Sequence, residues 1–201
     1  MRKLAGLAAV LSVFLLGHLA SAQQGDAMVG FGTLLSPSAS SCNLSTLTCP
    51  EKGGLYPSVS ADVIFHRRIG FAYEVAWRGG QGNYEGTGIP FRPIINDFNA
   101  VFQPRLGKKV GLDLMAGVGF QDTRFYGYNG SSQCNEFGQC YTSSDHFLVD
   151  IGGGLRYYFW HHVFIRPEIK YYNVHNNTAD FTGNNLLRVG ASIGYTIGGP
   201  D

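Results

Sequence analysis

Charged side chains are scarce in this sequence, and their scarcity narrows what the protein can be. Asp, Glu, Lys and Arg together make up 14% of the chain, compared with about 25% in ordinary soluble domains. A soluble β-protein carries charges along its wet face, so this composition indicates a fold without a large wet face. The formal net charge is only +1, which gives no electrostatic reason to expect nucleic acid as a partner.

Long apolar runs are also missing, apart from one at the N-terminus. No later segment approaches the ~18 consecutive apolar residues of a transmembrane helix. The N-terminal run, 4–16, follows a basic start and precedes the small residues Ala-Ser-Ala at 20–22. This combination is typical of a secretory signal peptide, and the run is too short for a comfortable membrane anchor. We expect residues 1–22 to be a cleaved signal and residues 23–201 to form one domain.

What the sequence has in abundance is alternation with a period of two, the mark of strands with two different faces. In segment 69–78 one face is wholly apolar, with Ile69, Phe71, Tyr73, Val75 and Trp77. The pattern recurs cleanly at 110–121, 147–159 and 187–197, and less cleanly at 27–34, 58–66, 94–105 and 163–174. Pro104 and Pro167 predict strand ends or bulges in two of the weaker segments.

The connections between these eight segments alternate between short and long. The short ones are 67–68, 107–109 and 160–162, and the long ones, rich in Gly, Ser, Asn and Thr, are 35–57, 79–93, 127–145 and 175–185. Outer-membrane barrels have short periplasmic turns and longer extracellular loops. A sheet can cross hydrocarbon only when it closes, because every backbone polar group must be paired. The sequence therefore predicts an all-β protein, an eight-stranded antiparallel up-and-down transmembrane β-barrel with four long extracellular loops.

The predicted inward face mixes small residues with isolated charges. An eight-stranded barrel is just wide enough to be filled by side chains, and a buried charge without a partner is costly. Charges of both signs in near balance therefore predict ion pairs across a plugged lumen. The predicted luminal charge network consists of Asp62, Glu74, Arg78, Asp113, Asp150, Arg156, Arg166, Glu168, Lys170 and Arg188.

Four cysteines lie in two of the long loops, Cys42 and Cys49 in the first and Cys134 and Cys140 in the third. An even count in an exported protein favours disulfide bonds, and three pairings are possible. We prefer the local pairs 42–49 and 134–140, because each closes a short loop. The spacings do not match C-x-x-C, so a metal site is the weaker interpretation.

Two short motifs resemble ligand-binding sites, but we interpret neither as one. His161-His162 and His66 stand in tight turns, where adjacent histidines point apart and no carboxylate accompanies them. We expect solvated turn residues there, and we expect no metal and no cofactor in this protein. The run 152–154 is Gly-Gly-Gly, but it lacks the following helix that a phosphate-binding loop needs.

Signal peptide, alternating strands and one-sided long loops together resemble the small outer-membrane β-barrel family, the type represented by the transmembrane domain of outer membrane protein A. The resemblance covers residues 23–198, and segment 188–197 looks like the family's final strand. The chain departs from the family by continuing to Asp201 instead of ending on an aromatic residue. The resemblance implies a monomer in the bacterial outer membrane, in contact with outer-membrane lipid. No family active site maps onto the chain.

Four functional interpretations follow. The first, which we prefer, is a structural and surface-interaction role in which the loops meet an extracellular ligand or partner, without enzymatic activity. The second is a small channel, which the bulky basic residues of the lumen argue against. The third is a lipid-modifying enzyme centred on Ser143, Ser144 and His146, disfavoured because sequence neighbours on a strand point to opposite faces. The fourth, a soluble exported barrel for an apolar ligand, leaves too little charge for solubility.

Overall fold

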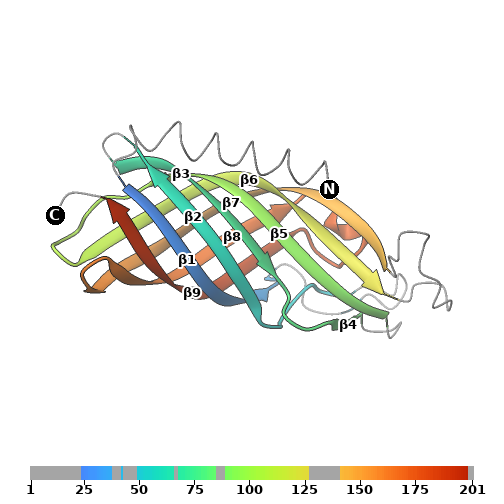
Figure 1. The fold of residues 1–201 in the computed structure, drawn as a ribbon. Coiled ribbons are helices and arrows are strands. Elements are labelled where there is room, and N and C mark those ends of the chain that lie inside the picture. The colour runs from blue at the N-terminus through green and yellow to red at the C-terminus, as the bar shows by residue number, and fades with distance from the viewer. Residues whose placement is uncertain are drawn as a thin grey trace, which may run out of the picture.

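A single antiparallel sheet, closed on itself, makes up the structure (Figure 1). The computed structural model describes residues 24–37, 42, 49–65, 68–84, 89–126 and 141–198. Its strands are β1 (Gln24–Leu35), β2 (Tyr56–Ile64), β3 (Ile69–Trp77), β4 (Gly82–Tyr84), β5 (Ile89–Phe102), β6 (Val110–Tyr126), β7 (Tyr141–Trp160), β8 (Val163–Val174) and β9 (Asn185–Gly198). Within this described part, pairing of β3 with β5 closes eight strands into a barrel, and the short β4 extends beside β5. The predicted fold class is confirmed.

The two ends of the barrel differ in the length of their connections. At the end that we call the short-turn end, Gln24 of β1 pairs with Gly198 of β9. The connections at this end are 65–68, 103–109 and 161–162. The opposite, long-loop end carries 36–55, 78–88 with β4 inside it, 127–140, and 175–184 with the 3-10 turn Asn177–Ala179. Figure 1 shows β4 at this end, opposite the C-terminal end of β9. The predicted alternation of short and long connections is thus confirmed.

Residues 1–23 lie outside the described residues, so the signal peptide stays a prediction. Several strands extend further than the sequence predicted, including β5, which begins at Ile89 and not at 94. β6 continues to Tyr126 and β7 begins at Tyr141, and their extensions pair with each other as a polar hairpin. The predicted boundary at 121 was wrong because strand pairing continues after the apolar face has ended.

Pro167 was expected to interrupt its strand, and this prediction was wrong. β8 runs through Pro167, which pairs with Ala191 of β9 in continuous register. The ladder between β8 and β7 is interrupted there instead, since the pairing skips the stretch between 154 and 157 of β7. A proline at such a break removes no hydrogen bond from the ladder. Pro104, by contrast, follows the end of β5 as predicted.

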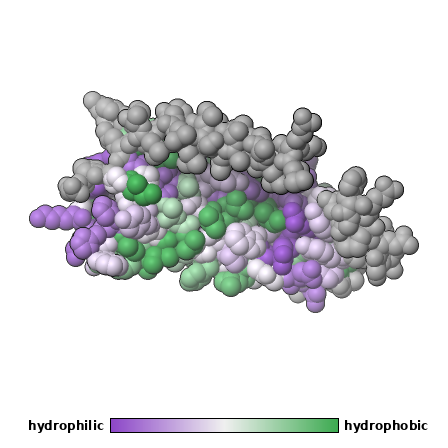
Figure 2. All heavy atoms as spheres, in the orientation of Figure 1, coloured by the Kyte–Doolittle hydropathy of each residue, from purple (hydrophilic) through white to green (hydrophobic). Residues whose placement is uncertain are grey.

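The barrel has an apolar outer face and a polar inner face, the reverse of a soluble protein. On the outer face Phe71 is 64% exposed, whereas Arg188 on the inner face is only 1% exposed. Figure 2 shows apolar residues gathered on the middle of the visible barrel wall and hydrophilic ones toward its two ends. A soluble ligand-binding barrel would need the opposite arrangement, so this alternative from the sequence was wrong. None of the described helical segments is long and apolar enough to cross a lipid bilayer.

An apolar layer fills the inside of the barrel below the long-loop end. It consists of Leu34, Tyr56, Ile95, Leu148, Tyr172, Val174 and Leu186. These side chains come from six strands and pack against one another inside the barrel. The layer separates the loops of that end from the charged part of the lumen.

Candidate functional site

Arg156 is the centre of the charged lumen. It projects inward from β7 and is 2% exposed. Its guanidinium donates to Asp113 of the adjacent β6 at 2.8 Å and to Asp62 of β2 at 2.8 Å, and it also pairs with Asp26 of β1. Because β2 and β7 lie on opposite sides of the eight-stranded ring, this one side chain connects the two walls. The ring of Phe164 lies 4.3 Å from the guanidinium carbon and covers its flat face.

Arg166 of β8 shares these carboxylates and extends the network. Its Nη1 donates to Asp113 at 3.2 Å and to Asp62 at 3.4 Å. Its Nη2 lies 2.8 Å from Glu168 on the same strand. Two guanidinium groups therefore share the same pair of aspartates, and the aspartates hold the guanidiniums side by side.

A second cluster lies nearer the long-loop end. Lys170 of β8 donates to Glu74 of β3 at 2.9 Å and to Asp97 of β5 at 3.1 Å. Arg188 of β9 pairs with Glu74 and lies 3.3 Å from Glu168. Since Glu168 also pairs with Arg166, it joins the two clusters into one network. Charge-assisted hydrogen bonds of this kind are stronger than neutral ones. Several of them, such as the one from Lys170 to Glu74, link strands that are not neighbours in the sheet.

Glycines make room for the long basic side chains. A Cβ atom on Gly152 would lie 2.7 Å from Cγ of Lys170, and one on Gly154 would lie 2.9 Å from Cγ of Arg166. Any other residue at these positions would push the cation out of its place. The glycine run that lacks a phosphate-binding context therefore has a structural use, which is to let the charged side chains pass close to the barrel wall.

Eight of the ten residues in the predicted luminal network take part in these ion pairs. Asp150 is buried on β7, the strand that also carries Arg156, but it forms no ion pair with the described cations. Arg78 lies at the long-loop end, with its guanidinium carbon 5.1 Å from the centre of the Phe91 ring. Sequence reasoning missed Asp26 and Asp97, which fall in or beside segments with weaker alternation. The inward positions of those segments were the signal that could have found them.

The expected near balance of charge was wrong for the described lumen. Seven buried carboxylates face four basic side chains. The carboxylates are Asp26, Asp62, Glu74, Asp97, Asp113, Asp150 and Glu168, and the basic residues are Arg156, Arg166, Lys170 and Arg188. Each of the four basic side chains donates to two or three carboxylates at once, so the cations are shared among the more numerous carboxylates.

The long-loop end is covered by a loop cap, which we define as residues 49–54, 82–84 and 175–184. Phe181 is its anchor, 1% exposed. The ring of Phe181 lies 5.7 Å from Tyr84, 5.4 Å from Phe91 and 6.4 Å from Phe125. Aromatic pairs at these separations contribute beyond the area that they bury. The cap thus packs into the mouth of the barrel as a small apolar core.

Glu51 is a buried carboxyl group within this cap. Its Oε2 accepts hydrogen bonds from Gln121 at 2.9 Å and from Asn177 at 3.4 Å. Burial raises the pKa of Glu51 to about 7, and the two hydrogen bonds only partly offset this increase. The cap therefore favours the neutral form of this group.

A disulfide bond fastens the first loop to the cap. Cys42 and Cys49 are joined, which is one of the two local pairs that we preferred. The carbonyl oxygen of Cys49 accepts a backbone hydrogen bond from Thr182 at 3.2 Å, which ties the first loop to the last. Cys134 and Cys140 lie outside the described residues, so their pairing stays a prediction.

Ser144, His146 and Asp180 come together beside the cap. Ser144 and His146 are two residues apart on β7 and share its inward face, and the loop residue Asp180 completes the cluster. His146 Nε2 lies 3.0 Å from Ser144 Oγ and 2.9 Å from Asp180 Oδ2. A nucleophile–base–carboxylate relay needs the two partners on different ring nitrogens. Here both contact the same nitrogen, which suits a link between strand and loop. Ser143 is exposed and is not part of this cluster.

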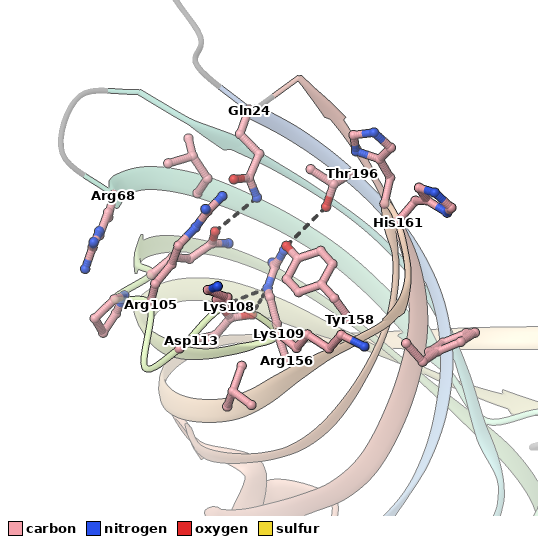
Figure 3. A pocket seen from close by; sticks show the side chains of 18 of the residues that line it. Gln24, Arg68, Arg105, Lys108, Lys109, Asp113, Arg156, Tyr158, His161 and Thr196 are labelled. Carbon is pink, nitrogen blue, oxygen red and sulfur yellow. Dashed lines mark hydrogen bonds and ion pairs between the residues drawn. The ribbon is translucent and has the colours of Figure 1, made fainter. Parts of the chain in front are cut away.

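The short-turn end has no comparable cover among the described residues and opens into a cavity of about 780 Å³. Figure 3 shows this cavity with the Arg156–Asp113 ion pair at its inner side. The predicted solvated histidines, His161 and His162, lie on its rim. The described residues hold no cluster of His, Cys, Asp or Glu suited to a metal ion.

A closed antiparallel barrel with an apolar exterior and a charged interior defines an integral outer-membrane protein, because only closed sheets can cross hydrocarbon. The sequence agrees. It matches the model of the outer membrane protein beta-barrel domain over residues 6–196, and the chain belongs to this family. No curated protein matches the sequence.

Solved structures with the same fold come from several bacteria. Ail, the attachment invasion locus protein of Yersinia pestis, crystallised with the heparin analogue sucrose octasulfate, is 14% identical with a TM-score of 0.56, over 87% of this chain and 98% of that one. Neisserial surface protein A is 14% identical with a TM-score of 0.57, over 86% and 95%. The N-terminal barrel of Pseudomonas aeruginosa OprF is 11% identical with a TM-score of 0.52, over 88% and 99%. At these identities the likeness concerns the fold alone.

Family and fold locate the protein in the bacterial outer membrane, as predicted. In such barrels the short turns and both strand termini face the periplasm, and the long loops face the exterior. From here on the short-turn end is the periplasmic end and the long-loop end is the extracellular end.

Proposed function

We propose that this protein is a monomeric, non-conducting outer-membrane barrel that serves as a structural support for surface contacts made by its extracellular loops. The observation that carries the proposal is the reach of Arg156 from β7 to carboxylates on β1 and β2. A side chain that connects opposite walls occupies the path that an ion would follow. Barrels of eight strands enclose only enough space for their own side chains, which supports a plugged lumen.

The loop cap supports the same proposal from the other direction. Phe181 and its aromatic neighbours fill the extracellular mouth above the apolar layer. An ion entering from outside would have to cross aromatic and aliphatic side chains before it met the charged network. The channel interpretation therefore requires two independent rearrangements, one of the cap and one of the ion pairs.

The lipid-modifying enzyme is the weaker candidate. Ser144 and His146 are in contact, but Asp180 shares the nitrogen that faces the serine. In this arrangement the carboxylate cannot orient the imidazole through its other nitrogen, as nucleophilic catalysis requires. The cluster also faces inward, away from the lipid that such an enzyme would modify.

The proposed role of the loops in surface contacts is supported by the loops at the extracellular end and by analogy with a protein of the same fold. Ail, which shares the fold, was crystallised with a heparin analogue. Here the extracellular end presents four connections, and its described residues include the exposed Lys52 of the first loop and the half-buried Arg124 near the end of β6. We propose that the loops of this protein likewise meet an extracellular ligand or partner.

The lumen is tested by conductance. The full chain, exported by a host with an outer membrane and purified in detergent, is added to planar lipid bilayers beside a large porin as a positive control. We expect no unitary current steps from the protein while the porin conducts. Regular steps that scale with protein concentration would contradict a plugged lumen.

The loops are tested by a deletion that leaves the barrel intact. Tyr126 pairs with Tyr141, so residues 127–140 can be replaced by an Asn-Gly turn that closes the hairpin. We expect cells that display this variant to adhere less to heparin-coated surfaces, or to become more sensitive to detergent, than cells with the unaltered protein. A boiled and unboiled gel comparison checks that the variant barrel folds. If neither adhesion nor envelope integrity changes, the surface role is wrong.

A further inference from the structure

The cavity at the periplasmic mouth has a charge that the rest of the lumen does not share. Its rim carries cationic and imidazole side chains from three separate connections. They are Arg68 between β2 and β3, Arg105, Lys108 and Lys109 between β5 and β6, and His161 and His162 between β7 and β8. Figure 3 shows Arg68 and His161 on opposite sides of the mouth, with Lys108 and Lys109 between them in this view.

Carboxylates are scarce among the described residues that line this cavity. Among the described residues that line the cavity, Asp113 is the one carboxylate. It already accepts from Arg156 at 2.8 Å and from Arg166 at 3.2 Å. The carboxylate excess of the lumen is thus held deeper in the barrel by its own cations, while Lys108 and Lys109 on the rim are exposed. An anion that enters the mouth meets positive charge on several sides.

The inner wall of the cavity also contains a buried amide group with an unused hydrogen-bond donor. Gln103, which lines the cavity, is 9% exposed. Its Oε1 accepts from Gln24 at 3.3 Å, while its Nε2 has no hydrogen-bond partner. Buried amide groups are nearly always paired. A rotation of the Gln103 amide that turns Nε2 toward the cavity would let an acceptor oxygen there complete the hydrogen bonding of this side chain.

We propose that the periplasmic mouth is a binding site for a phosphate group. Guanidinium and ammonium groups are the side chains that bind phosphate oxygens best, and two of each surround this cavity. A volume of about 780 Å³ lies in the range of small-molecule sites. The phosphate belongs either to a soluble phosphate compound of the periplasm or to the headgroup of a phospholipid in the inner leaflet. Trp160, 65% exposed and beside the rim, is of the residue type that sits at headgroup level.

This site is independent of the proposed function, because an anion held at the mouth need not cross the lumen. Its test uses Trp160, one of the cavity residues, as a local reporter. The chain has two tryptophans, and a Trp77→Phe background leaves Trp160 as the single one. Two probes are used: inorganic pyrophosphate with the full chain in uncharged detergent, and nanodiscs of phosphatidylcholine with or without phosphatidylglycerol.

We expect saturable changes in Trp160 fluorescence with at least one probe. The double variant Lys108→Ala/Lys109→Ala should weaken that response at least tenfold, and Gln103→Leu should weaken it several-fold. Lys52→Ala, which removes an exposed lysine at the extracellular end, is the matched control and should change nothing. Because Lys108 and Lys109 are exposed turn residues, their variant should fold, as a boiled and unboiled gel comparison verifies.

The two arms distinguish the source of the phosphate. A response to pyrophosphate in detergent supports a soluble phosphate compound, and a response only to phosphatidylglycerol supports a lipid headgroup. Absence of both responses would overturn the site. So would a response that the double lysine variant leaves unchanged, or one that Lys52→Ala weakens equally. None of these outcomes depends on whether the barrel conducts or adheres.

Discussion

At the extracellular end of the barrel, Phe181 and Glu51 are buried within the loop cap, whereas at the periplasmic end Lys108 and Lys109 stand exposed around a cavity. The same eight strands supply both ends, so the wall does not cause the difference. The connections do. A connection of ten or more residues can fold back over the mouth, while a two-residue turn such as 161–162 only reverses the chain.

The comparison shows that closure and charge are arranged separately along the barrel axis. The extracellular end is closed by apolar packing and hydrogen bonds within the cap, and the middle is closed by ion pairs. The periplasmic end keeps its cations available to solvent. Substitutions placed at different levels of the barrel should therefore have separable effects.

Arg156→Met should have the largest effect, because it removes the cation shared by Asp26, Asp62 and Asp113. Removal of one partner from a buried ion pair costs about 3–5 kcal/mol. We expect the free energy of unfolding to decrease by that order when the protein, refolded into lipid vesicles, is titrated with urea. Lys52→Met, which removes an exposed cation, is the control. Equal midpoints for the two variants would show that the network does not stabilise the barrel.

Phe181→Ala should act on the extracellular end alone. Truncation of a fully buried phenylalanine costs about 3–5 kcal/mol in a compact core. For a cap at the mouth of a barrel we expect a loss of stability near the lower limit of this range. We expect backbone amides of 175–184 to exchange hydrogen much faster, while those of β8 keep their protection. Loss of protection throughout β8 would mean that the cap and the barrel unfold together, which contradicts the separation of levels.

The fold and the lipid face could be predicted from alternation alone, because the bilayer imposes one rule on every outward residue, which is that its side chain must be apolar. Phe71 and Ile151 follow that rule without reference to any neighbour. The inward face was predictable only in part. Which charges meet depends on which strands stand opposite after closure, as for Arg156 and Asp62, and no local pattern contains this information.

The cap was beyond prediction for a different reason. Its contacts join residues far apart in sequence through irregular chain, such as Glu51 with Asn177 and His146 with Asp180. Neither periodicity nor a turn signal marks these pairs. The periplasmic cavity was missed because His161 and His162 were judged as a turn by themselves, without the lysines that another turn brings to the same mouth.

Glycine positions allow a finer test of the charged middle. Gly154→Ala places a methyl group 2.9 Å from Cγ of Arg166, whereas Gly153→Ala, on the next residue, meets its nearest atom at 3.4 Å. Overpacking of this kind costs about 1–3 kcal/mol. We expect Gly154→Ala to lower the midpoint of urea unfolding clearly more than Gly153→Ala. The same shift for both would mean that backbone freedom, not the space for Arg166, is what glycine provides here.

Glu51→Gln should have the smallest effect, and one confined to the cap. The pKa of Glu51 is raised from 4.5 to about 7, mainly by burial, while Arg78 and Asp180 act on it with opposite signs. A group whose pKa is higher in the closed state stabilises that state fully below about pH 4.5 and loses this contribution as the pH rises through about 7.

Hydrogen exchange of residues 175–184, corrected for the intrinsic pH dependence of exchange, should therefore accelerate between pH 5 and pH 8 in the unaltered protein. We expect a change of only a few-fold, since an opened cap need not return Glu51 completely to bulk water. In Glu51→Gln the side chain stays neutral and can still accept from Gln121, so the acceleration should disappear. If the variant keeps the full pH dependence, another group controls the cap, and His146 with its partner Asp180 would be substituted next.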